Sequence, residues 1–305
     1  MGTILVVGTV AIDSIETPFG KEDEVLGGSA THFAAAASFL APVRLVGIVG
    51  EDFPLDDLKF LKARKVDLSG LKVGRGKSFR WAGRYSYDMN RRDTLRTELG
   101  VIENYSPEIP AEWKNPDHLF LGNIDPKFQM KVLEEAGRPK KIYIDTMNLW
   151  IETQRKWVEE VLAKAHLVVI NEEEARQLTK ETSLVKAAKQ IGSWGPVAIV
   201  IKRGEYGALL FYKGEIFSAP GLPLEEVKDP TGAGDTFAGG LVGYLAMSDQ
   251  FDFEHLKKGV IIGSAMASFN VEDFGPNRLK DLEIGEIQGR IAEFQKLGSF
   301  GKIEI

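Results

Sequence analysis

The residues best suited to chemistry form one short segment, Asp-Pro-Thr-Gly-Ala-Gly-Asp at positions 229–235, just before a long apolar stretch. Gly232, Ala233 and Gly234 have little or no side chain, so their backbone N–H groups stay uncovered. If a helix begins there, the unpaired N–H donors and the helix dipole together form a site for an anion such as a phosphate. Asp235 could then accept the proton of a hydroxyl group that attacks the phosphorus. An aspartate that only caps its helix fits the segment equally well, so these residues alone leave the chemistry open.

The composition excludes several other kinds of catalytic site. The chain has 305 residues and no cysteine, so neither a thiolate nucleophile nor a zinc–thiolate centre can form. Its four histidines are scattered along the sequence, which disfavours a histidine metal cluster or a serine–histidine triad. Carboxylates are therefore the expected catalytic groups.

The charge and hydropathy patterns argue against nucleic acids and membranes as partners. The formal net charge is −6, which disfavours general nucleic-acid binding. The longest apolar run, residues 33–41, is about half as long as a membrane span. The first residues lack the pattern of a signal peptide, so we expect a cytoplasmic protein. Residues 59–96 stand apart, with twelve Lys and Arg against three acids, and predict either a solvated basic face or a region that gathers anionic ligands.

Apolar runs of strand length alternate with amphipathic runs of helix length, as in a parallel sheet covered by helices on both faces. The expected strands cover residues 3–12, 43–49, 118–122, 141–145, 166–170 and 197–202. The expected helices cover residues 30–40, behind a Ser29 cap, and residues 55–65, 127–137, 154–164, 184–192, 232–247, 253–270 and 283–297. The predicted fold class is α/β, with a doubly wound, mostly parallel sheet and residues 1–305 as one domain.

Two segments, about 14–26 and 77–102, break this rhythm. We expect each of them to form an antiparallel ribbon, and the two together to form a small sheet that acts as a lid over the active site. In the second segment Phe79, Trp81 and Tyr85 alternate with smaller or charged residues and so share one face. These aromatic side chains could stack on a flat ring such as a nucleobase, or bury against a second subunit. The second alternative predicts a homodimer formed through the lid.

The sequence of the chain resembles a known family, the ribokinase-like (PfkB) carbohydrate kinases. The second signature of that family reads Asp-Thr-x-Gly-Ala-Gly-Asp, and residues 229–235 depart from it only at Pro230. Further landmarks of the family follow in the same order over most of the chain: Asp13 after the first strand, Gly27-Gly28 before the first long helix, Asn171 to Glu174 after a strand, and Gly204 to Gly207 after a later strand. The resemblance implies a ribokinase-like fold and ATP-dependent phosphorylation of an alcohol group.

The resemblance also implies roles on the nucleotide side. It makes Gly232, Ala233 and Gly234 the anion hole and Asp235 the base. The residues that it assigns to the nucleotide are Asn171, Glu174, Lys202, Gly204, Gly207 and Thr231. Among these, Asn171 and Glu174 would hold Mg²⁺ through water, although Asn171 also suits a helix cap. Lys202 stands where the family often has Thr, and is either a cation that reaches the phosphates or a solvated lysine. Many relatives bind a monovalent cation beside the anion hole, and Pro230 leaves that requirement open here.

On the substrate side, Asp13, Gly27 and Gly28 match residues that grip sugar hydroxyls and hinge the lid. A carboxylate suits this role because it can accept two hydrogen bonds from a vicinal diol. His32 stands where the family usually has Asn, and is expected either to be structural or to alter hydroxyl recognition. The remaining candidates follow predicted strands: Asn123 and Asp125, and, with little weight because their turn is one residue longer than in relatives, Asp145 and Asn148.

Together these residues predict an ATP- and Mg²⁺-dependent kinase that phosphorylates the primary alcohol of a small sugar or nucleoside. The basic stretch keeps an already phosphorylated sugar open as the acceptor. A sensor that binds a nucleotide or sugar without turnover is the alternative of a different class. Asp235 argues against a sensor, because a pure binder needs no base. An ADP-dependent kinase with the same fold is less expected, since those enzymes are usually longer.

Overall fold

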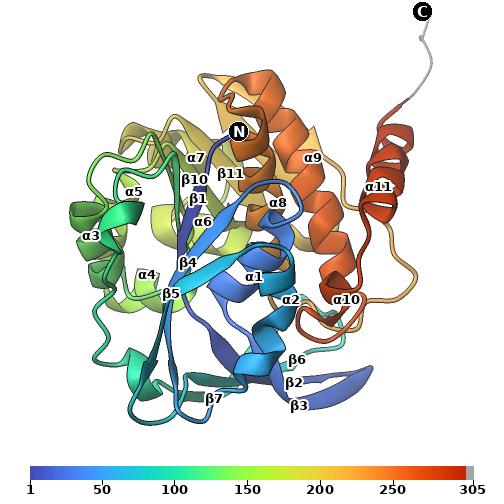
Figure 1. Cartoon of the computed structure of the whole chain (residues 1–305). Helices are drawn as coiled ribbons and strands as arrows, with labels where there is room; N and C mark the ends of the chain where they lie inside the picture. Colours follow the sequence, from blue (N-terminus) through green and yellow to red (C-terminus); the bar gives the residue numbers. More distant parts are fainter. Residues whose placement is uncertain (300–305) are drawn as a thin grey trace, which may run out of the picture.

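The computed structural model describes residues 1–299 and contains two separate sheets (Figure 1). The larger sheet has nine strands in the order β13-β12-β11-β10-β9-β8-β1-β4-β5. Its parallel strands are β1 (Ile4–Val7), β4 (Val43–Gly50), β5 (Asp67–Gly74), β8 (His118–Leu121), β9 (Lys141–Ile144), β10 (Leu167–Asn171) and β11 (Ala198–Lys202). Two antiparallel strands, β12 (Ala208–Tyr212) and β13 (Glu215–Ala219), complete one edge. The predicted doubly wound, mostly parallel sheet is confirmed.

Helices cover both faces of this sheet because its strands are apolar on both sides. In β1, Ile4 and Val6 belong to one buried cluster and Leu5 and Val7 to the other. The first cluster lies under α1 (Ser29–Ala37), α2 (Lys59–Ala63), α8 (Ala233–Ser248), α9 (Phe253–Asn270), α10 (Asn277–Lys280) and α11 (Ile284–Leu297). The second lies under α3 (Pro126–Glu135), α4 (Asn148–Thr153), α5 (Arg155–Leu162), α6 (Glu172–Thr179) and α7 (Leu184–Ser193). Within residues 1–299, no helix combines the length and apolarity that crossing a bilayer requires.

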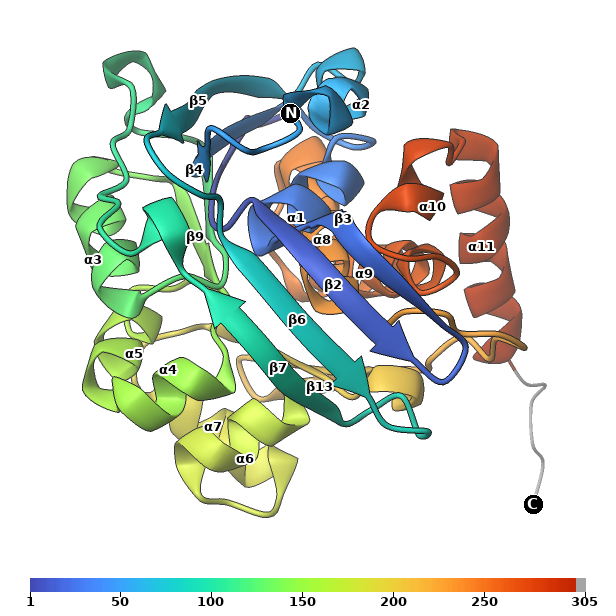
Figure 2. The same cartoon turned by 90° about the horizontal axis from the view of Figure 1, so that it is seen from below.

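The smaller sheet is the predicted lid, and it lies across the end of the larger sheet (Figure 2). Its order is β3-β2-β6-β7, formed by β2 (Ala11–Thr17), β3 (Gly20–Gly27), β6 (Arg80–Tyr85) and β7 (Arg92–Glu98). Each of the two segments forms the predicted antiparallel ribbon, and β2 pairs with β6 in parallel to join the two ribbons. Two antiparallel hairpins therefore meet side by side, each contributed by a different part of the chain.

Several local predictions also need correction. The apolar run 3–12 is not one strand: the chain leaves the large sheet after β1 and enters the lid as β2. Ser29 is the first residue of α1 rather than its cap; Gly28 is the N-cap, and the Ser29 hydroxyl contacts Thr9 and the Asn123 carbonyl instead. The segment 55–65 forms a 3-10 turn followed by the short α2. Strands β5, β12 and β13 were not predicted: β5 and β13 are the partly exposed edge strands of the sheet, and β12 lies next to the edge, between β11 and β13.

Candidate active site

The segment 229–235 forms a tight bend that leads into α8. Gly232 is the N-cap residue of this helix, with a left-handed φ of 74°. A Cβ atom at Gly232 would overlap the ring of His32, so both the backbone conformation and the packing require glycine. The amides of Gly232 and Gly234 form no hydrogen bond within residues 1–299, whereas the amide of Ala233 donates to the Pro230 carbonyl at 3.2 Å. Two of the three predicted anion-hole amides are thus free to bind an anion.

Buried polar contacts hold the bend in place. The two carboxylate oxygens of Asp229 accept hydrogen bonds from the amides of Thr231, at 2.8 Å, and Gly275, at 3.1 Å. Asn270, the last residue of α9, donates from Nδ2 to the Thr231 carbonyl at 2.8 Å. Its Oδ1 accepts from Thr236 Oγ1 at 2.9 Å. Sequence reasoning missed Asn270, although an Asn at the end of an otherwise apolar helix is a weak signal of a buried polar role.

His32 joins this network and also lines the cavity described below. Its Nδ1 lies 2.9 Å from Asn270 Oδ1. Because that oxygen can only accept, the proton of the neutral imidazole is on Nδ1. Burial lowers the pKa of His32 to about 4, so the ring is uncharged at neutral pH. The ring of His32 also packs against Gly232 of the bend, so His32 supports the bend as well as lining the cavity.

Asp13 lies against the glycine pair that precedes α1. A Cβ atom on Gly27 would overlap Asp13 Oδ2, and one on Gly28 would overlap the Thr9 carbonyl. Glycine at both positions lets the Asp13 carboxylate sit directly on the backbone of the turn between β3 and α1. Burial, followed by the charges of Asp229 and Asp235, raises the pKa of Asp13 to about 8. The structure thus brings Asp13, Gly27 and Gly28 together, as the resemblance implied.

Lys202, the last residue of β11, reaches the bend from the large sheet. Its Nζ lies 3.2 Å from Asp145 Oδ2 and 2.9 Å from the position that a Cβ atom of Gly234 would occupy. The side chain of Lys202 is only 15% exposed, so the solvated-lysine alternative is wrong. Asp145, which received little weight from its spacing, is therefore part of the site. Burial and Asp145 raise the pKa of Asp235 to about 7, while Lys202 and Arg92 act in the opposite direction.

Asn171 and Glu174 form a capping box at the start of α6. Each donates its amide to the side chain of the other, at 2.8 Å in both cases. Glu174 Oε1 forms no hydrogen bond to another residue in the described chain, and burial and Asp145 raise the pKa of this carboxyl to about 8. Residues 1–299 contain no group of three or more His, Cys, Asp or Glu side chains that could enclose a metal. One free carboxylate oxygen suits Mg²⁺, which usually keeps several waters and binds substrate phosphates. The pair therefore fits a water-mediated Mg²⁺ site.

A cavity of about 400 Å³ lies between the bend and the lid. Asp13, Gly232 and Asp235 line it together. The lid contributes residues from β6 and β7, which lie side by side in the smaller sheet (Figure 2). Much of the remaining lining is apolar or aromatic and comes from Phe79, Trp81, Ile102, Ile124, Phe128, Leu149 and Trp150. The cavity thus places the carboxyl groups of Asp13 and Asp235 beside a lining of apolar and aromatic side chains.

The sequence pattern of the pfkB family carbohydrate kinases matches residues 1–281. The chain belongs to this family. A cytidine kinase from Thermococcus kodakarensis is 33% identical over 249 residues, which cover 79% of this chain and 88% of that protein. Burkholderia thailandensis nucleoside kinase in complex with inosine has a TM-score of 0.77 at 21% identity, over 95% of this chain and 98% of that one. Ribokinase II from E. coli in complex with ATP and Mg²⁺ has a TM-score of 0.77 at 20% identity, over 96% and 100%. As a PfkB kinase, the chain phosphorylates a sugar or nucleoside with ATP.

In this PfkB kinase Gly204 and Gly207 lie in the turn between β11 and β12, outside the lining of the 400 Å³ cavity. The tip of the lid touches this turn, because Asn90 Nδ2 lies 3.5 Å from Glu205 Oε1. The lid also touches the bend, where Thr231 Oγ1 donates to the Tyr85 hydroxyl at 3.1 Å. The smaller sheet therefore contacts two of the segments that the resemblance assigns to the nucleotide.

Asn123 and Asp125 line the cavity, but their polar atoms already have partners. Asn123 Oδ1 accepts from the indole N–H of Trp150 at 2.9 Å. Asp125 caps α3 through the amide of Lys127 and accepts from Gln154 Nε2, both at 2.8 Å. These two side chains therefore hold the part of the cavity lining that carries Trp150. A substrate could form hydrogen bonds to them only by displacing these contacts. Asn148 is paired with Gln177 at 2.8 Å.

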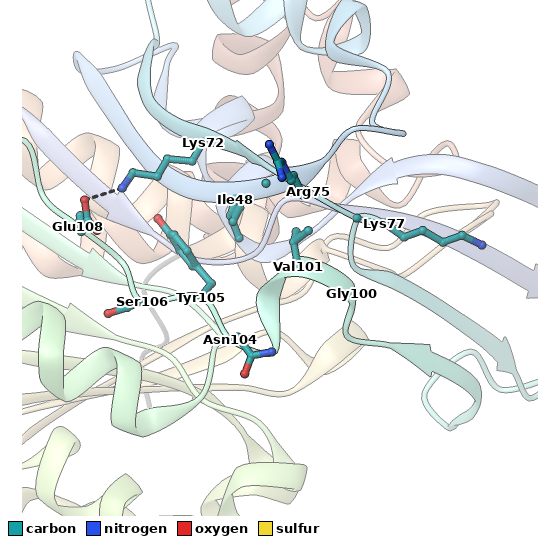
Figure 3. Close-up of a pocket in the computed structure, with 12 residues that line it drawn as sticks. Ile48, Lys72, Arg75, Lys77, Gly100, Val101, Asn104, Tyr105, Ser106 and Glu108 are labelled. Atoms are coloured by element: carbon teal, nitrogen blue, oxygen red, sulfur yellow. Dashed lines mark hydrogen bonds and ion pairs between the residues drawn. The ribbon is translucent and has the colours of Figure 1, made fainter.

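The basic stretch 59–96 does not converge on one site. Several of its cations pair with acids, in the pairs Lys59–Asp56, Lys72–Glu108, Arg80–Asp52, Arg84–Glu16 and Arg96–Glu98. A second hollow of about 630 Å³ lies where the chain enters and leaves β6 and β7. Figure 3 shows that Arg75 and Lys77 point in different directions there, while Lys72 is held by Glu108. The stretch is thus mostly a solvated face, and among the described residues Arg92 is the one Lys or Arg that lines the 400 Å³ cavity.

Proposed function

We propose that this kinase transfers the γ-phosphoryl group of ATP to the primary alcohol of a nucleoside. The observation that carries the proposal is the cavity that joins Asp13 and Asp235 to the aromatic side chains of Phe79, Trp81 and Trp150. Asp13 can accept two hydrogen bonds from the vicinal diol of a ribose, and the aromatic rings suit a nucleobase. The cavity volume of about 400 Å³ is in the range of small-molecule sites. The cytidine kinase relative and the inosine-bound structural neighbour support a nucleoside acceptor.

In this proposal Asp235 takes the proton of the attacking hydroxyl. A new O–P bond forms as the bond between the γ-phosphorus and the β–γ bridging oxygen breaks, and ADP leaves. The free amides of Gly232 and Gly234 and the ammonium of Lys202 stabilise the charge that develops on the phosphoryl oxygens. Thr231, Gly204 and Gly207 are proposed to contact the nucleotide. Glu174 and Asn171 would hold Mg²⁺ through water, and a bound Mg²⁺ neutralises phosphate charge.

An already phosphorylated sugar is the second candidate acceptor, and the charge of the cavity disfavours it. Four carboxylates line the cavity, from Asp13, Glu103, Asp125 and Asp235, against the single cation of Arg92. A second phosphate on the acceptor would add negative charge to a lining that is already acidic. The proposal therefore favours an uncharged nucleoside over a sugar phosphate.

A screen of nucleosides, sugars and sugar phosphates for acceptor-dependent release of ADP tests the proposal. Asp235→Asn should bind ATP within about threefold of the wild type and lose at least about 100-fold in kcat, since positioned proton transfer contributes 10²-fold or more. Asp57→Asn, an exposed Asp-to-Asn control, should keep full activity. Asp235→Asn with more than about a tenth of the wild-type rate would remove Asp235 from the role of base. Turnover of sugars but not of nucleosides would overturn the nucleoside assignment.

Three further expectations stay predictions. A monovalent cation beside the bend is tested by replacing K⁺ with tetramethylammonium in the assay. A homodimer through the lid is tested by measuring the mass of the protein in solution by sedimentation. The lid carries the ion pairs Arg80–Glu24 and Arg84–Glu16, which a lid interface would have to accommodate. A cytoplasmic location, where ATP is abundant, is tested by fractionation of cells.

A further inference from the structure

Glu103 is a charged residue of the acceptor cavity to which the mechanism above gives no role. It directly follows the 3-10 turn η2 (Gly100–Ile102) and lines the 400 Å³ cavity. Its backbone N–H donates to the Gly100 carbonyl at 3.3 Å, and its exposed side chain makes no hydrogen bond or ion pair within residues 1–299. The other three acids of the lining are either held by hydrogen bonds or given a role above. Glu103 therefore brings an unpaired carboxylate to the cavity.

The backbone around Glu103 is held from both sides. Ile102, the preceding residue, is buried with Tyr105 and Ile124 in a small apolar cluster. The Tyr105 hydroxyl donates to the backbone carbonyl of Gly47 in β4 at 3.2 Å, which ties the segment to the larger sheet. The chain therefore presents the Glu103 carboxylate from a defined place, as a selective binding group requires.

The cavity has a polar part and an apolar part. Asp13 and Asp235 belong to the polar part, and they lie near enough for the charge of Asp235 to raise the pKa of Asp13. Phe79 and Phe128 line the apolar part and pack against the apolar cluster that precedes and follows Glu103 in the chain. A nucleoside whose ribose binds Asp13 would therefore bring its base to these aromatic rings and to the Glu103 carboxylate.

We propose that Glu103 selects the nucleobase by accepting a hydrogen bond from an exocyclic amino group, such as N4 of cytosine or N6 of adenine. The inference rests on the proposed function and names the class of nucleoside. A base that fills the apolar part displaces water from the carboxylate, and a charged group that loses its water must gain donors in exchange. A carboxylate can only accept, so it suits an amino group, as carboxylates do at cytosine N4 in DNA. Uracil and hypoxanthine have a carbonyl oxygen at that position, which the carboxylate repels.

Matched pairs of nucleosides and matched glutamate variants test the role. Cytidine and uridine, and likewise adenosine and inosine, differ in the amino or carbonyl group and in the proton on the adjacent ring nitrogen. In every pair that the wild type accepts, kcat/KM should be at least about tenfold higher for the amino member, since one good base contact discriminates by that much. Glu103→Gln, whose amide can donate as well as accept, should reduce this ratio to less than about threefold. Glu112→Gln, an exposed glutamate outside the cavity lining, should keep the wild-type ratio.

The ratio separates base selection from a structural role. A structural loss lowers kcat/KM for both members of a pair alike, whereas a loss of selection changes their ratio. Glu103→Ala should lower kcat/KM for the amino member and leave that of the carbonyl member equal or higher. Equal kcat/KM for both members in the wild type, or an unchanged ratio in both Glu103 variants, would overturn the inference while the proposed function stands. Phosphorylation of sugars and of no nucleoside would reject the proposed function, and the inference with it.

Discussion

The pKa of the Asp235 carboxyl is subject to opposing influences. Burial and the negative charge of Asp145 favour its neutral form, while Lys202 and Arg92 favour the ionised form, and the resulting pKa is about 7. A base must be unprotonated before it can accept a proton, so a pKa near the working pH gives a group that is both available and basic enough. The charged residues around Asp235 therefore tune its pKa.

This balance predicts the pH dependence of the reaction. The value of kcat/KM should rise with pH and level off above about 7, as Asp235 loses its proton. Lys202→Met removes a cation that lowers the pKa of Asp235, so the rising limb should move to higher pH in addition to any loss of rate. Lys189→Met, on the exposed side of α7, serves as the control and should leave the limb in place. The pH profile of kcat/KM with a nucleoside acceptor, measured for both variants, provides the test. If the rise of kcat/KM stays at the same pH in Lys202→Met, the rise does not report the pKa of Asp235.

At the scale of elements, the lid is held by a few specific contacts rather than by a large core. A small buried cluster joins Ile15 and Tyr85 of the lid to Phe274, which follows α9, with Val25, Trp81 and Met89 packed against it. The Tyr85–Thr231 hydrogen bond is buried and joins the lid to the bend. Elements with small cores open more readily than the main sheet. We therefore expect the strength of this one contact to affect how often the lid opens.

Tyr85→Phe tests this expectation. The substitution keeps the ring but leaves the Thr231 hydroxyl without its acceptor, at a cost of about 1 kcal/mol, or roughly a fivefold change in the opening equilibrium. Amide hydrogen exchange over residues 80–98 should become faster by about that factor. Tyr87→Phe in the same hairpin is a matched control, because Tyr87 is 87% exposed. If both variants exchange at the wild-type rate, the hydroxyl contact does not hold the lid.

For the whole molecule, gathering acids with raised pKa values at the candidate site has a cost in stability. Asp13, Glu174 and Asp235 have pKa values of about 8, 8 and 7 in the folded protein, against 3.8 to 4.5 for the ordinary groups. Between about pH 4 and pH 8 the folded state therefore holds protons that the unfolded state has released. The contribution of these three groups to the free energy of unfolding should therefore fall as pH rises through this window. It should be largest near pH 4.

Asp13→Asn tests the size of this effect. An amide cannot ionise, so the variant should be more stable than the wild type by about 1 kcal/mol or more at pH 8, and the difference should disappear near pH 4. The same variant should lose affinity for the acceptor, because Asp13 is proposed to hold the diol. Urea unfolding at several pH values provides the measurement. A stability difference that does not change with pH would show that the Asp13 carboxyl is not shifted upward.

The fold and much of the site were predictable because they follow from local patterns of residue type and spacing. The alternation of apolar runs in β1, β4, β8, β10 and β11 indicated a sheet buried on both faces, and the segment 253–270 was predicted as a helix with the bounds that α9 shows. Edge strands such as β5 escaped because half-exposed strands carry mixed polar and apolar residues. The parallel pairing of β2 with β6 escaped because register between distant segments is set by packing.

Residue type and spacing alone predicted that residues 229–235 form a glycine bend at a helix start, and they left open whether Asp235 acts on a bound anion or only caps the helix. They could not determine what surrounds that bend. Asn270 contacts His32, which is 238 positions away in the sequence, and Asp145 contacts Lys202, which is 57 positions away. Arg92 lies on a strand of the separate smaller sheet. Helical and extended conformations follow from neighbours a few residues apart, whereas the partners of a buried charge follow from how whole elements pack. Only the tertiary structure therefore decided which charges tune Asp235 and which of twelve clustered cations reaches the cavity.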